Sequence, residues 1–167
     1  MERIGDSNQA LWIPEQKLER VEHGLGYAGP GVVALKSVVA PDFHQALLGE
    51  LSDPTRVTWR DAGGTYTNQR GLEIVQNHDV FSLKSEGGYE PIWAVPLMAQ
   101  LAIEAEMFVQ ELGDRYPTLA HWQADEMSYH NYYGKEVGLS FHRDNMRFPG
   151  LIVVIAIDGE CDFQVID

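Results

Sequence analysis

The sequence predicts an α+β fold with an antiparallel sheet, and three observations support this class. Apolar residues recur at helical spacing after Pro41 and again after Pro96. After Pro117 they recur at every second position, which is typical of strands. A last apolar run, 151–157, precedes Asp158-Gly159, a dipeptide favoured in hairpin turns. Helical patterns that precede strand patterns favour segregated helices beside an antiparallel sheet.

The composition predicts one folded domain. The 167 residues are 44% apolar and 22% charged, which is enough apolar material for a core. Residues 1–30 are polar and Gly-rich, and they predict an irregular lead-in with one short helical turn over 15–21. We assign strands and supporting helices to 31–122 and the first strands of the sheet core to 123–167.

The charge balance limits the partners. Lys and Arg number 12 against 25 Asp and Glu, a net charge of −13, so a broad nucleic-acid-binding surface is disfavoured. The single cysteine, Cys161, excludes an internal disulfide and a Cys-based zinc site. No run reaches the ~18 apolar residues of a membrane span, and Met1–Asp6 lacks a signal core. We therefore expect a cytoplasmic protein without a membrane partner.

The first half of the chain predicts short elements. Val32–Val39 is β-branched and apolar, as in a strand, and Pro41 then starts a helix that ends at Asp53-Pro54. Strand-like pieces follow at 56–61 and 72–75, around a turn at Gly63-Gly64, and 77–89 is polar and predicted to be a loop.

The strongest helical pattern begins at Pro96, because proline is tolerated only in the first turn of a helix. Gly113 is its expected C-cap. Its predicted apolar side comprises Leu97, Leu101, Ala105, Phe108 and Leu112.

Two strand patterns near the end of the chain carry polar residues at alternating positions. Asn131 and Tyr133 share one face of the first pattern with Met127 and Tyr129. His142 and Asp144 share one face of the second, about 7 Å apart along the strand at ~3.3 Å per residue. One imidazole and one carboxylate so placed can share a metal, and they are two members of the 2-His-1-carboxylate triad that binds Fe(II).

The pair belongs to a longer pattern, in which Asn131-x-Tyr133 is followed by Leu139-Ser140-x-His142-x-Asp144. This pattern resembles the AlkB-like branch of the Fe(II)/2-oxoglutarate-dependent oxygenases, and it matches without a gap. The later segments 152–159 and 163–165 are similar to the next two strands of that family. The resemblance covers about residues 123–167, and upstream only the general layout agrees.

The resemblance implies a double-stranded β-helix, or jelly roll, with helices packed on one sheet. It implies Fe(II) held by His142 and Asp144, and 2-oxoglutarate hydrogen-bonded by Asn131 and Tyr133. O₂ is then the other co-substrate, and ascorbate is a candidate reductant. The implied reaction hydroxylates or oxidatively demethylates a substrate, while 2-oxoglutarate loses CO₂ to give succinate.

Two functional groups of the family have no counterpart here. The family uses a second iron-binding histidine and a carboxylate-binding arginine far downstream, whereas 23 residues follow Asp144 (167 − 144) and no histidine follows His142. We therefore expect a jelly roll that is incomplete at its C-terminus, within a longer enzyme that supplies both groups. The alternative is a complete but degenerate chain, which is a binding or structural module or completes its barrel with a partner chain.

The substrate stays open at this stage. The resemblance suggests a modified nucleobase flipped into the pocket, whereas the acidic balance favours a protein side chain or a small molecule. The alternative from another class is a catalytically incomplete jelly-roll domain that binds or interacts. A cupin-type enzyme without 2-oxoglutarate is disfavoured, because such sites generally add histidines.

Overall fold

The computed structural model describes residues 9–25, 32–67, 71–83, 95–124, 127–132, 138–140, 151–159 and 164. The helices are α1 (Glu15–Leu25), α2 (Pro41–Leu51) and α3 (Pro96–Glu111), and two 3₁₀ turns, Leu112–Asp114 and Pro117–Leu119, follow α3. The strands are β1 (Arg60–Asp61), β2 (Gly64–Thr67), β3 (Glu73–Asn77), β4 (Asp79–Leu83), β5 (Met127–Asn131) and β6 (Gly138–Leu139).

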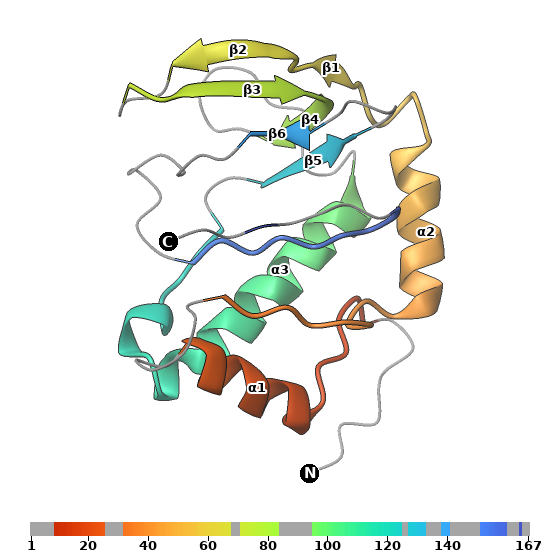
Figure 1. Cartoon of the computed structure of the whole chain (residues 1–167). Coiled ribbons are helices and arrows are strands. Elements are labelled where there is room, and N and C mark those ends of the chain that lie inside the picture. Colours follow the sequence, from red (N-terminus) through yellow and green to blue (C-terminus); the bar gives the residue numbers. More distant parts are fainter. Residues whose placement is uncertain are drawn as a thin grey trace.

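The strands lie on one side of the molecule and the helices cover the other (Figure 1). In this view α3 runs beneath the strands, α2 stands beside them and α1 lies at the bottom. All strand pairs are antiparallel, in two three-stranded sheets of order β1-β4-β5 and β2-β3-β6. The expected mixture of helices and antiparallel sheet is therefore confirmed.

β1 and β2 pair with β4 and β3 in one continuous register. Arg60 pairs with Val80 and Thr67 with Glu73, so seven residues separate the pairs on each strand (67 − 60 and 80 − 73). The segments 60–67 and 73–80 therefore form one ladder, which the Ala62 N–H continues by donating to the His78 carbonyl at 3.0 Å.

β5 and β6 also pair with β4 and β3, but they do not follow one continuous register. Asn131 pairs with Asp79 and Gly138 with Asn77, so seven residues of one partner (138 − 131) face two of the other (79 − 77). The chain from β5 to β6 is thus five residues longer than a continuous register would need. Both strands nevertheless pair with the same segment, 73–83.

The core lies between the strands and helices α2 and α3. Phe81 of β4 and Tyr129 of β5 are directly paired and buried, and they pack in the same cluster as Phe43 and Leu47 of α2 and Met98 of α3. Because strand side chains alternate, the other face of β5 carries Ser128 and His130 away from the helices.

Both proline-initiated helices were predicted correctly, with Pro41 and Pro96 in their first turns. The predicted apolar side of α3 is only partly right. Leu101, Ala105 and Leu112 are buried, but Met98 and Val109 replace Leu97 and Phe108 as the other buried residues.

Four of the described strands precede α3, so the expected order of helices first and strands last is wrong. The predicted loop at 77–89 contains β4, in which Phe81 is buried in the core. The predicted turn at Gly63-Gly64 is a break within one strand segment, and Gly71, with φ +75°, lies between β2 and β3 instead. At 15–21 a single turn was expected, whereas α1 extends over Glu15–Leu25.

Two apolar segments are not strands. Within 32–39 only Val39 pairs, in an isolated bridge with Leu11. Segment 151–157 is extended, but residues 152–156 make no backbone hydrogen bond to other described residues. A continuous apolar run is typical of a strand buried on both faces, but here Ile155 and Ile157 pack on the core whereas Val154 is 68% exposed. Gly159 does adopt the left-handed conformation that the Asp-Gly pattern predicts, with φ +76°.

Gly113 does not end α3 in the left-handed conformation, and the predicted C-cap is wrong. Leu112 is the C-cap, and Gly113 is buried where an added Cβ would lie 2.5 Å from the Ala120 Cα. The residue is therefore small because the two 3₁₀ turns approach each other closely.

Among the described residues, no helix combines the length and the apolar character that crossing a bilayer requires.

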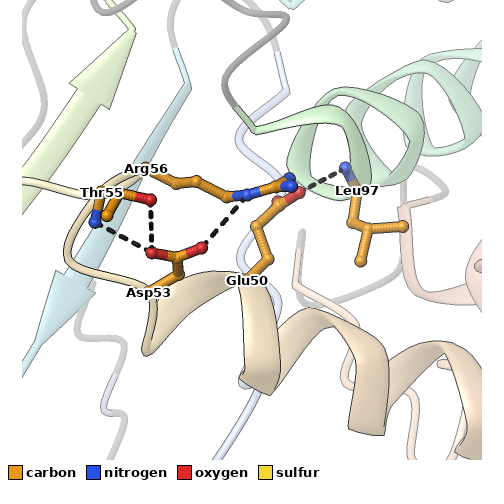
Figure 2. Close-up of polar contacts among 5 residues, drawn as sticks. All are labelled: Glu50, Asp53, Thr55, Arg56 and Leu97. Carbon is orange, nitrogen blue, oxygen red and sulfur yellow. Dashed lines mark hydrogen bonds and ion pairs between the residues drawn. The ribbon is translucent and has the colours of Figure 1, made fainter.

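A buried carboxylate joins α2 to α3 (Figure 2). Glu50 is 5% exposed, and its two oxygens accept hydrogen bonds from the Leu97 and Met98 backbone N–H groups at 2.9 Å each. The first N–H groups of a helix have no partner within it, and the positive end of the helix dipole favours an anion there. Nearby, Asp53 and Arg56 form an exposed ion pair at 3.3 Å.

Replacing Glu50 tests this connection. Glu50→Ala should lower the free energy of unfolding by about 2–3 kcal/mol, because two buried N–H groups lose a charged acceptor. Arg56→Ala, which removes only the exposed pair, should change it by less than about 1 kcal/mol. Urea denaturation measures both, and equal effects would show that the Glu50 contact is not special.

Candidate functional site

The structure describes one of the four predicted site residues. His142, Asp144 and Tyr133 lie outside the described residues, as does Cys161. Asn131 is the last residue of β5, is exposed, and pairs with Asp79 of β4. The structure therefore fixes the position of Asn131 and leaves the iron-binding pair as a prediction.

Asn131 belongs to a polar row across three strands. Asp61 pairs with Asp79, and Asp79 pairs with Asn131, so the three residues are neighbours on one face of the sheet. Alternation puts this row on the same face as Phe81 and Tyr129, beyond the edge of the core. Asn131 is thus paired directly with Asp79, with Asp61 one strand further away, and any anion that Asn131 binds experiences repulsion from these carboxylates.

Ser140, in the segment that leads to the predicted iron ligands, is fixed on β3. Its backbone N–H donates to the Val75 carbonyl at 2.9 Å, and its hydroxyl oxygen accepts from the Val75 N–H at 3.0 Å. The described residues of the Asn-to-Asp pattern therefore attach to two neighbouring parts of segment 73–83.

A second group of polar residues, which the sequence patterns did not single out, lies on the opposite face of β5. His130 Nδ1 is 2.9 Å from Nε2 of His78, and His130 Nε2 is 2.8 Å from the Ser128 hydroxyl. The Tyr132 ring stands 4.8 Å from the His78 ring, centroid to centroid. These four residues are called the histidine cluster below.

His78 is the buried member of the histidine cluster. It is 4% exposed, and its Nδ1 has no hydrogen-bond partner among the described residues. Burial lowers the pKa of His78 below its usual 6.5, although Asp79 and Asp61 oppose that change. The cluster could have been anticipated from one signal, the alternation of Ser128, His130 and Tyr132 along β5.

The described residues contain no group of three or more His, Cys, Asp or Glu side chains able to hold a metal ion. His142 and Asp144 still fit Fe(II) by their chemistry, because one imidazole and one carboxylate are two of its three usual ligands.

Comparisons of the chain with protein-family models, with curated proteins and with solved structures found no match.

Tyr129 gives a test of the buried face of β5. Its hydroxyl is buried without a partner among the described residues, and burial, aided by Glu50, raises the pKa of the phenol well above 10. Tyr129→Phe should therefore leave the free energy of unfolding unchanged or raise it by up to about 1 kcal/mol. Tyr66→Phe, at an exposed position, is the control. A loss above about 1 kcal/mol for Tyr129→Phe in thermal denaturation would reveal a partner of the hydroxyl.

Proposed function

We propose that this chain carries the iron-binding strands of an Fe(II)/2-oxoglutarate-dependent dioxygenase with a jelly-roll fold. The observation that carries the proposal is the gapless pattern of Asn131-x-Tyr133 and Leu139-Ser140-x-His142-x-Asp144. His142 and Asp144 bind iron in this proposal, and Asn131 and Tyr133 bind 2-oxoglutarate.

The arrangement of the strands supports the proposal. The two parts of the pattern that the structure describes, at Asn131 and at Leu139-Ser140, both pair with segment 73–83. The segment 73–83 thus pairs with the first residue of the pattern and with its Leu139-Ser140 part, which precedes the proposed iron ligands. Antiparallel sheet with helices on one face is also the layout that one side of a jelly roll needs.

Each protein group has one task in this function. His142 and Asp144 hold the ion, and the Asn131 amide and Tyr133 hydroxyl donate hydrogen bonds that orient the co-substrate carboxylates. When bound, iron and 2-oxoglutarate together supply the oxidising step that hydroxylates or demethylates the substrate. The third iron ligand and a carboxylate-binding arginine are not among the assigned residues.

The substrate class follows from charge only in part. A net charge of −13 favours a protein side chain or a small molecule over a long nucleic acid. A single modified nucleobase is compatible with the same pocket, because flipping exposes one base to it.

Anaerobic titration of the full-length protein with Fe(II) and 2-oxoglutarate tests the assignment. We expect the weak visible charge-transfer band of the chelate, and His142→Ala or Asp144→Ala should abolish it, because each removes an iron ligand. His121→Ala, at an exposed position, should keep it. A protein without the band, folded and iron-free, would instead be a jelly-roll binding or interaction domain.

The polar row gives a second test of the co-substrate role. If Asn131 binds a 2-oxoglutarate carboxylate, Asp79→Asn should tighten 2-oxoglutarate binding severalfold, because it removes a negative charge from the residue paired with Asn131. Asn131→Asp should weaken binding for the same reason. Calorimetric affinities that respond to neither variant would show that Asn131 lies away from the co-substrate.

A further inference from the structure

Two imidazoles meet at the residue that joins β3 to β4. The 2.9 Å contact between His78 Nε2 and His130 Nδ1 has room for one proton, because two N–H groups cannot point at each other. The other nitrogen of His130 contacts the Ser128 hydroxyl, and the other nitrogen of His78 is buried without a described partner.

When both imidazoles are neutral, one arrangement of their protons fits this geometry. His78 Nε2–H donates to His130 Nδ1, and His130 Nε2–H donates to the Ser128 oxygen. The buried Nδ1 of His78 then carries only a lone pair. An unpaired acceptor in the interior is better tolerated than an unpaired N–H donor, which favours this tautomer.

A proton added to this pair finds no hydrogen-bond acceptor among the described residues while the contact is intact. With the contact intact, a singly charged pair carries one N–H between the rings, one N–H on His130 Nε2 and one N–H on His78 Nδ1. The last of these is a charged donor in the interior with no acceptor among the described residues. The closed contact therefore excludes the proton that each free imidazole would accept near pH 6.5.

We propose that His78 and His130 form a two-histidine switch that takes up its additional proton only when the contact opens, so that acidification releases the end of β5. The switch stands apart from the iron-binding proposal, because neither histidine has a role in that site.

The charged neighbours set the pH range. Asp79 of β4 and Asp61 of β1 raise the pKa of His78, and burial has the larger, opposite effect. The ring of Tyr132, the residue after β5, also faces His78. The closed-state pKa is therefore below 6.5 and the open-state pKa is near 6.5. The open state binds more protons, so the closed contact loses stability as the pH falls through 6.5, until the lowered pKa is reached.

The position of the switch determines what it moves. His130 and Tyr132 flank Asn131, and beyond β5 the register shifts by five residues before β6 begins. Opening the contact therefore loosens the end of β5 and leaves the α2–α3 contacts in place.

Hydrogen–deuterium exchange of the full chain between about pH 7 and about pH 5 tests the switch. Protection factors remove the intrinsic pH dependence of exchange, so they report the opening alone. Protection over 127–132 should fall by up to about tenfold per pH unit below about 6.5, and protection of α3 should stay constant. In His78→Phe, which keeps a ring but has no nitrogen, the fall should vanish, and in His121→Gln it should persist.

Constant protection over 127–132 in the wild type, or an equal fall in His78→Phe, would overturn the proposal. Should His78→Phe not fold, nitrogen NMR shifts of the wild-type histidines give the same decision. A protonated His78 Nδ1 at about pH 6 with protection over 127–132 unchanged contradicts the switch.

Discussion

The Glu50 carboxylate is the contact on which the arrangement of helices and strands depends. Glu50 lies on α2 and accepts hydrogen bonds from the N-terminus of α3, so it holds the two helices together at the point where α3 begins. Phe81 and Tyr129 then pack against these two helices, and through them β4 and β5 are placed. A charge in the interior is tolerated here because both of its oxygens are hydrogen-bonded.

The sequence predicted what is governed locally. Pro41 and Pro96 restrict φ and lack an N–H, which suffices to start α2 and α3. β4 was missed because Asp79 and Ser82 give the segment a polar character, although Phe81 within it is buried in the core. For segment 151–157 the error was the opposite one, a predicted strand that the structure does not contain. Its apolar residues predict a strand, but they do not specify a pairing partner.

The candidate site also has a part that the sequence predicted and a part that it did not. The residue types of the pattern from Asn131 to Asp144 indicate chemistry, and this part was available from the sequence. That Asn131 pairs with Asp79, and that His130 contacts His78, depends on pairing between segments about fifty residues apart. Strand register decides both, and no local pattern encodes it.

The contact between the Glu104 carboxylate and the N-terminal segment has a consequence for synthesis of the chain. Glu104 of α3 accepts hydrogen bonds from the Ala10 and Leu11 N–H groups, at 2.9 and 2.8 Å, across 94 and 93 residues. On the ribosome the N-terminal segment emerges first but has no such partner until α3 has followed it. The segment can pair with Val38–Ala40 earlier, but its contacts with Glu104 form only after α3 has been synthesised.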